Sequence, residues 1–265
     1  MKFKIPKYLI VLSFSLLLSS TTIQSQTVNT DFANEINAVF AGMDKSKVPH
    51  KLLLDYAMEF TELSAYNGVL TDTNYVQRGV YKSIYNTLLM ARVQNVPSLV
   101  SPTTFKTNWE NLRIENKIVL SGLYYKYSKI RDNALAQNDI TVSNNKYYDK
   151  YINGVWQNPY ETRQVFAMSA PIVIYKKLSV DVELPANLWY TNQNNQVQSI
   201  AIDFGDGNGY QNIVFGQIKT VTYSQADTYD WTYKLTLTNN QVLYSRSKII
   251  IQESAPTATW SSHKQ

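Results

Sequence analysis

The clearest structural signal in this chain is the stretch YDWTYKLTL, residues 229–237, in which apolar and polar residues alternate without a break. Successive side chains of a β-strand point to opposite faces of a sheet, so the alternation predicts a strand with one buried and one solvated face. Segments 178–184 and 200–204 show the same period of two. Further short strands are expected near 211–215, 218–224 and 242–251.

Several short strands separated by turn residues are typical of an antiparallel β-sandwich of the immunoglobulin-like kind. Asn239-Asn240 is expected to turn one of its hairpins. We therefore expect residues 165–253 to form such a sandwich and residues 254–265 to be a disordered tail.

The run Ile202-Asp203-Phe204-Gly205-Asp206-Gly207 resembles the DFGDG signature of PKD (polycystic kidney disease) domains. The later VTY at 221–223 and ADTY at 226–229 fall where that family carries its aromatic and G-T-Y elements. The resemblance covers about residues 170–252 and implies a PKD-like sandwich. The chain departs from the family at Val221 and Asp227, where histidine and glycine are usual, which affects turn geometry more than fold.

The signature residues also have a direct physical explanation. Gly205 and Gly207 allow positive φ in a tight turn, and the carboxylates of Asp203 and Asp206 can accept backbone N–H bonds there. A calcium site formed by these carboxylates with Asn208 is the alternative. The turn is favoured, because an EF-hand loop needs oxygen ligands at alternate positions and a later glutamate.

Two aromatic residues of the following strand have expected structural roles. Tyr229 occupies the place of a tyrosine corner, whose hydroxyl bonds to backbone upstream. Trp231 stands where antibody domains keep a core cysteine, and this chain has no cysteine at all. We expect Trp231 to fill the space between the sheets without a disulfide.

Before residue 140, apolar residues recur at three- and four-residue steps, the period of amphipathic helices. We expect helices near 31–43, 51–63, 75–89 and 104–114. Segment 118–136 is interpreted as helix more than strand, although its first part, IVLSGLYY, also suits a buried strand. The fold class expected for the whole chain is therefore α+β multidomain, with an α-helical domain at 26–139 ahead of the sandwich.

Residues 140–164 are polar and aromatic, without a clean period. Asn153-Gly154 and Asn158-Pro159 are turn signals, so we expect an irregular, aromatic-rich connector.

Residues 1–25 have the layout of a secretory signal peptide, with three lysines before an apolar run at 8–18 and cleavage expected after Ser25. That run is shorter than the roughly 20 residues a membrane-spanning helix needs, so no permanent membrane span is expected after cleavage. We expect a protein exported by the Sec-type pathway to the medium, the cell surface or the periplasm.

The signal also accounts for most of the basic charge. It holds three of the 25 basic residues and none of the 20 acidic ones, so the remaining chain carries a net charge of +2. A chain so close to neutral is not expected to bind nucleic acid.

The sequence offers little for catalysis. There is no cysteine, the histidines are His50 and His263, and no nucleophile elbow, HExxH, phosphate loop or Rossmann motif occurs. We expect no catalytic residues, metal or cofactor. A glycosidase that uses only two carboxylates stays open, although carboxylates such as Glu59 and Glu110 fall at solvated helix positions.

Binding is the favoured role. Trp189 and Tyr190, beside an Asn/Gln-rich stretch, are the first candidates for an exposed contact, and Trp156 and Tyr160 are the second. An extracellular glycan or a cell-surface protein is the expected partner of this secreted structural, adhesive or ligand-contacting protein.

A second interpretation comes from the order of the segments. It loosely resembles the N-terminal portion of large secreted bacterial proteins, in which a region like this helical half and connector precedes a PKD-like module. In some of those proteins an α/β-hydrolase domain follows. The alternative function is therefore the accessory region of a secreted hydrolase whose catalytic domain is absent from this chain.

Overall fold

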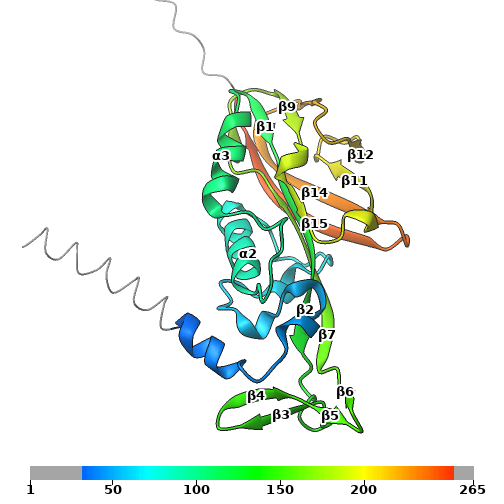
Figure 1. Ribbon diagram of the computed structural model, residues 1–265. Helices are drawn as coiled ribbons and strands as arrows, with labels where there is room; N and C mark the ends of the chain where they lie inside the picture. Colours follow the sequence, from blue (N-terminus) through cyan, green and yellow to red (C-terminus); the bar gives the residue numbers. More distant parts are fainter. Residues whose placement is uncertain (1–31, 254–265) are drawn as a thin grey trace, which may run out of the picture. The chain divides into compact units, whose positions relative to one another are not determined.

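The computed structural model describes residues 32–253 and divides them into two compact units (Figure 1). The smaller unit comprises 32–44 and 132–159, and the larger comprises 45–131 and 160–253. The predicted signal peptide at 1–25 and the predicted tail at 254–265 lie outside the described residues. None of the described helices combines the length and apolar character that a membrane crossing requires.

A five-stranded sheet forms the centre of the larger unit and confirms the predicted alternation. Its order is β12-β11-β14-β15-β8. The long antiparallel hairpin of β14 and β15 runs from Asp227 opposite Ile251 to Thr236 opposite Val242. The bounds are β8 Ile174–Tyr175, β11 Val197–Asp203, β12 Tyr210–Ile213, β14 Asp227–Leu237 and β15 Val242–Ile251.

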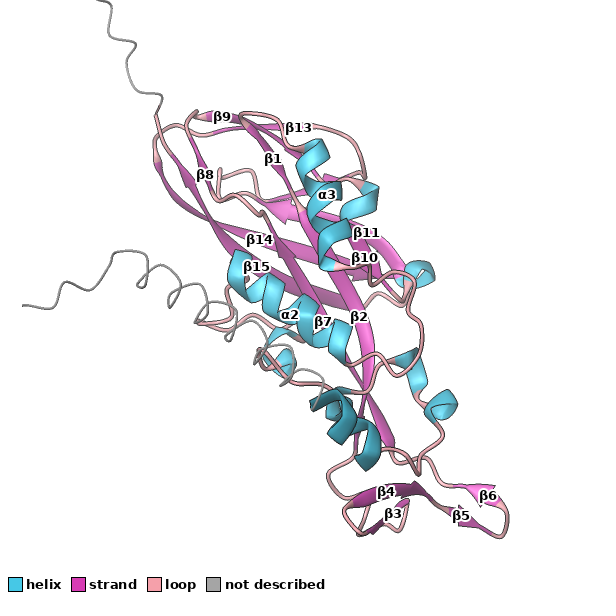
Figure 2. Ribbon diagram, turned by 60° about the vertical axis from the view of Figure 1, so that its left-hand side comes forward, coloured by secondary structure: helices cyan, strands magenta, loops and turns pink. Residues whose placement is uncertain are grey.

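Two three-stranded sheets share a core with this sheet. One has the order β1-β9-β13 and the other β10-β2-β7. Ile118 of β1 and Phe166 of β7 lie in the same buried cluster as Trp231 of β14. Strands from before residue 140 are therefore part of the sandwich (Figure 2). The bounds are β1 Lys117–Val119, β2 Ser121–Ile130, β7 Tyr160–Ser169, β9 Ser179–Glu183, β10 Trp189–Thr191 and β13 Lys219–Thr222.

The prediction of helix over 118–136 is wrong, because β1 and β2 occupy most of this segment. Both faces of β2 are buried: Tyr124 joins the sandwich core, while Leu123 and Tyr125 join a second core under the helices. A strand buried on both faces loses its apolar–polar alternation, and sequence periodicity cannot then separate it from a buried helix.

The predicted helix at 51–63 is also wrong. The segment consists of short 3-10 turns, and Leu52 and Leu53 are extended between them and form β-bridges with Arg92 and Ser128. The preceding residues His50 and Lys51 have φ of 61°, outside the helical region. The 3-10 turns of this region are Lys45–Lys47, Pro49–Lys51, Leu54–Tyr56 and Leu63–Tyr66.

Three of the predicted helices are present, at 32–39, in α2 (Arg78–Met90) and in α3 (Pro102–Leu112). α2 buries one stripe against the strands, and α3 begins at Ser101, whose Oγ accepts a hydrogen bond from the Thr104 backbone N–H. α2 and α3 lie in the same compact unit as the sandwich strands, whereas the helix at 32–39 lies in the smaller unit, so the separate helical domain predicted at 26–139 is not confirmed.

Most of the predicted connector at 140–164 consists of two short hairpins in the smaller unit. β3 (Ile140–Ser143) pairs with β4 (Lys146–Asp149), and β5 (Tyr151–Ile152) pairs with β6 (Val155–Trp156). Asn153-Gly154 forms the predicted turn, with φ of 51° and 79°. β7 begins at Tyr160, so the predicted boundary between 164 and 165 falls inside a strand.

The turn after β11 has the predicted geometry. Gly205 and Gly207 have φ of 67° and 84°. The Asp203 carboxylate accepts from the Gly205 N–H at 2.9 Å, and the Asp206 carboxylate accepts from the Asn208 N–H at 3.1 Å. Burial opposes ionisation of Asp206, but hydrogen bonds from Asn208 and Gln211 outweigh it and lower the pKa of this carboxyl. The bonds to both aspartates support the turn interpretation.

The tyrosine corner and the core tryptophan are confirmed. The Tyr229 hydroxyl donates to the Gln225 carbonyl at 2.9 Å. Trp231 is fully buried, and its Nε1–H donates a hydrogen bond of 2.8 Å to the Tyr223 hydroxyl. The Tyr223 hydroxyl in turn donates to the Phe204 carbonyl. The Phe204 and Trp231 rings meet edge to face. The core between the sheets is therefore filled by a hydrogen-bonded aromatic group.

We predict that Tyr229→Phe lowers the free energy of unfolding by about 1 kcal/mol, since it removes one intramolecular hydrogen bond. Chemical denaturation would measure the change. Tyr244→Phe is the matched control, because the Tyr244 hydroxyl has no hydrogen-bond partner among residues 32–253. Equal effects of the two changes would contradict a stabilising tyrosine corner.

We predict that Gly122→Ala destabilises the larger unit by about 1–3 kcal/mol. A Cβ at this position of β2 would lie 2.7 Å from the Trp189 ring. Gly79→Ala in α2 is the control, because its Cβ would meet nothing within 4 Å and the change should stabilise the helix by about 0.5–1 kcal/mol. A Gly122→Ala variant as stable as the wild type in thermal unfolding would show that Trp189 does not pack there.

Candidate functional site

Aromatic side chains from α2, α3 and β10 gather on the face of the β2–β7 pair that is turned away from the sandwich core. The Phe105 ring of α3 lies 5.8 Å from the ring of Tyr85 and 6.3 Å from that of Tyr81, both in α2. Its distance to the ring of Tyr190 in β10 is 5.9 Å. Tyr81, Tyr85 and Tyr190 are buried, so only part of this cluster faces solvent.

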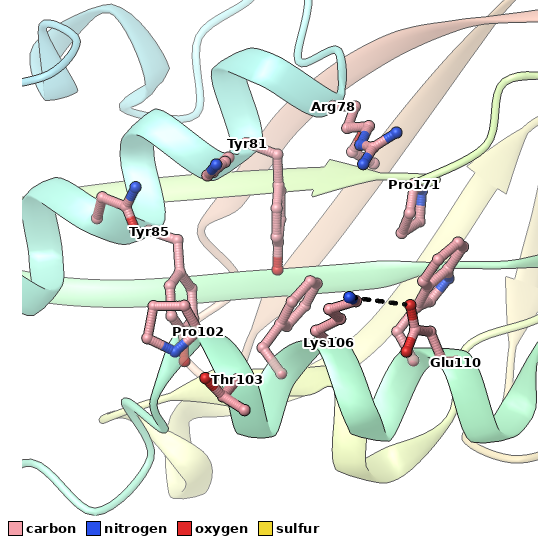
Figure 3. A pocket seen from close by; sticks show the side chains of 13 residues that line it. Arg78, Tyr81, Tyr85, Pro102, Thr103, Lys106, Glu110 and Pro171 are labelled. Carbon is pink, nitrogen blue, oxygen red and sulfur yellow. Dashed lines mark ion pairs between the residues drawn. The ribbon is translucent and has the colours of Figure 1, made fainter. Parts of the chain in front are cut away.

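A cleft of about 490 Å³ opens between α2 and α3, above this cluster. Figure 3 shows Tyr81 and Tyr85 on the α2 side and Thr103 and Lys106 on the α3 side, with Pro171 at one end. The lining residues are Arg78, Tyr81, Lys82, Tyr85, Asn86, Pro102, Thr103, Phe105, Lys106, Trp109, Glu110, Ser169 and Pro171.

The tyrosine hydroxyls of the cleft already have partners within the protein. The Tyr81 hydroxyl lies 2.8 Å from Ser121 Oγ, and the Tyr85 hydroxyl donates to the Val100 carbonyl at 2.8 Å. These residues therefore offer mainly ring carbon to the cleft. The Trp109 Nε1–H differs, because it is buried without an acceptor among the described residues.

Burial governs the ionisation of the tyrosines in and beneath the cleft. It raises the pKa of Tyr81, Tyr85 and Tyr125 far above the ordinary value and also raises the pKa of Tyr190. The pKa of Tyr127, in the same buried cluster, is raised to about 12 by burial. These phenols are neutral at physiological pH, so the floor of the cleft carries no charge.

His50 lies away from this cleft. Its Nε2 is 3.4 Å from Thr162 Oγ1, and its pKa is lowered by burial and by the charge of Lys126. Across residues 32–253, no group of three or more His, Cys, Asp or Glu side chains is arranged to hold a metal ion. The other histidine, His263, lies outside the described residues.

The predicted contact residues do not form one exposed surface. Tyr190 and Tyr160 are each only 4% exposed, so the prediction that they contact a partner from the surface is wrong. Tyr190 lies in β10 and Tyr160 begins β7, and both side chains are buried in the larger unit. The polar stretch that follows Tyr190 in the sequence gives no indication of this burial.

The two predicted tryptophan contacts are both partly buried. The Trp189 ring packs against Phe166 and Phe215, with centroids 6.5 Å and 5.9 Å away. In the smaller unit, the Trp156 Nε1–H donates to the Asp149 carboxylate at 2.9 Å. Both side chains thus have structural contacts.

Sequence reasoning missed the cleft between α2 and α3. The only signal was the four-residue spacing of Tyr81 with Tyr85 and of Phe105 with Trp109, which places each pair on one helix face. That spacing predicts an apolar stripe on each helix. It does not show that the two stripes face each other across an open space.

Comparison with known proteins adds little. No family model matches this chain, and no curated protein matches it. Among solved structures, the crystal structure of the PKD1 domain of Vibrio anguillarum Epp is similar at 18% identity, over 29% of this chain and 83% of that one, with a TM-score of 0.23. A similarity of this size carries no conclusion about function.

The buried tyrosines predict alkaline sensitivity. Tyrosine in the unfolded chain ionises near pH 10, whereas the pKa of Tyr127 in the folded protein is about 12. The stability that neutral tyrosines contribute is therefore present below pH 10 and lost as pH rises through about 12. Tyrosinate absorbance at 295 nm and far-UV circular dichroism, recorded together, should show a late ionisation phase that coincides with unfolding. Ionisation of all tyrosines near pH 10 with the fold intact would contradict this prediction.

Proposed function

We propose that this chain is an exported, non-catalytic protein with a PKD-like sandwich as its scaffold, and that it contacts an apolar ligand through the cleft between α2 and α3. The observation that supports the proposal is the combination of an open cleft of about 490 Å³ with a lining of Tyr81, Tyr85, Phe105 and Trp109. Export rests on the layout of residues 1–25 alone.

The size and chemistry of the cleft suit a small ligand. Binding sites for small molecules usually have volumes of about 300–1,000 Å³ and an apolar or aromatic lining with a few polar groups. The lining tyrosines have their hydroxyls bonded inside the protein, which leaves ring faces for contact with a ligand. Their neutral state at physiological pH keeps the floor apolar.

The cleft supports the ligand-contacting form of the role more than the adhesive one. Stacking on a glycan would need an exposed aromatic platform, whereas Tyr190 is buried and the Trp189 ring packs against two neighbouring rings. No contact among the described residues favours the hydrolase-accessory alternative.

Binding of the neutral fluorescent probe 1-aminoanthracene to the full chain tests the proposal. We expect a saturable rise in fluorescence that octanol reverses by competition. Phe105→Ala should weaken probe binding about tenfold, since a lost contact worth about 1.4 kcal/mol changes a dissociation constant by that factor.

Thr107→Ala is the matched control, because Thr107 is exposed on α3 and does not line the cleft. Circular dichroism would verify that both variants are folded. The proposal fails if the wild type shows no saturable binding, or if Phe105→Ala, with its fold intact, binds the probe as the wild type does.

A further inference from the structure

We infer that the ligand of this cleft is a small amphiphile with an alkyl or aryl body and a single anionic head group. This inference rests on the function proposed above and adds the charge of the ligand. It comes from the distribution of cations and hydrogen-bond donors around an otherwise apolar cleft.

Positive charge predominates at the cleft. Arg78 and Lys82 of α2 and Lys106 of α3 line it, against Glu110 as the one carboxylate among the lining residues (Figure 3). Lys106 Nζ lies 3.7 Å from Glu110 Oε1, so these two charges offset each other. Within residues 32–253, neither Arg78 nor Lys82 has an ion-pair partner. Two uncompensated cations beside apolar walls attract an anion.

The cleft lining also offers one buried, uncommitted hydrogen-bond donor, whereas the unpaired buried oxygen next to Arg78, Gln77 Oε1, is not among the lining residues. The Trp109 Nε1–H is buried and has no acceptor among the described residues. The first turn of α2 contains no acidic residue, and Gln77 at its N-cap makes no side-chain capping bond. A helix N-terminus without a cap carries partial positive charge on its exposed N–H groups. A head group that only accepts hydrogen bonds, such as a carboxylate, complements this set.

The arrangement also decides which end of the ligand enters the cleft. Arg78 and Lys82 are exposed, whereas Tyr81 and Tyr85, on the same helix, are buried. The charged head group would therefore stay hydrated beside the two cations, and the apolar body would lie against the rings. Such an orientation avoids the large cost of transferring a carboxylate into an apolar interior.

Competition by two ligands that differ only in the head group tests the inference. We expect octanoate and octanol each to displace 1-aminoanthracene from the full chain at neutral pH and low salt. We expect Arg78→Gln and Lys82→Gln each to weaken octanoate about threefold, the size of effect that exposed ion pairs produce, and to leave octanol unchanged. Salt at high concentration should weaken octanoate selectively.

The control is Lys177→Gln, which removes one positive charge from an exposed position outside the cleft. It should change neither competitor. Equal loss of octanoate binding in all three variants would overturn a local anion site, because the effect would then come from net charge. Octanoate binding that is unchanged by Arg78→Gln and Lys82→Gln would also overturn the inference. If octanol still displaces the probe in that case, the proposed function itself is not contradicted. Failure of both competitors and of the probe itself would instead refute the proposed function.

Discussion

The antiparallel pairing of β2 with β7 is the contact on which the rest of the larger unit depends. Its register runs from Ser121 opposite Ser169 to Ile130 opposite Tyr160. The two strands directly precede and follow residues 132–159, the second segment of the smaller unit. Both faces of the pair are buried. Tyr124 and Phe166 belong to the sandwich core, and Leu123 and Ala167 belong to the core under the helices.

This double burial also positions the candidate site. α2 covers the face of the pair that is turned away from the sandwich core (Figure 2). β10 extends the same sheet by pairing in parallel with β2, which brings the Tyr190 ring into contact with the rings of Tyr85 and Phe105. The cleft is thus supported by strands and helices whose side chains are held by packing. A rigid support of this kind keeps an apolar opening from collapsing, because close-packed interiors tolerate little rearrangement.

The abundance of tyrosine has a physical explanation in these cores. The chain has 20 tyrosines and no cysteine. Several buried tyrosines fill space with their rings and satisfy their hydroxyls on short polar groups, as Tyr233 does with Ser247 and Tyr125 with Ser98. Tyr223 links Trp231 to the Phe204 carbonyl in the same way. Aromatic packing with paired hydroxyls thus fills the core of this cysteine-free sandwich.

The sequence by itself determined the features that depend on local pattern: the alternating strand at 229–237, the glycine turn after Asp203, the Tyr229 corner, and helices close to α2 and α3. Each follows from side-chain period or backbone preference within a few residues. Only the tertiary structure decided that β2 is a strand, that 51–63 is not a helix, and that the apolar stripes of α2 and α3 face a common cleft. Burial on both faces erases the period of a strand, and the meeting of two helix faces depends on long-range pairing that local sequence does not encode.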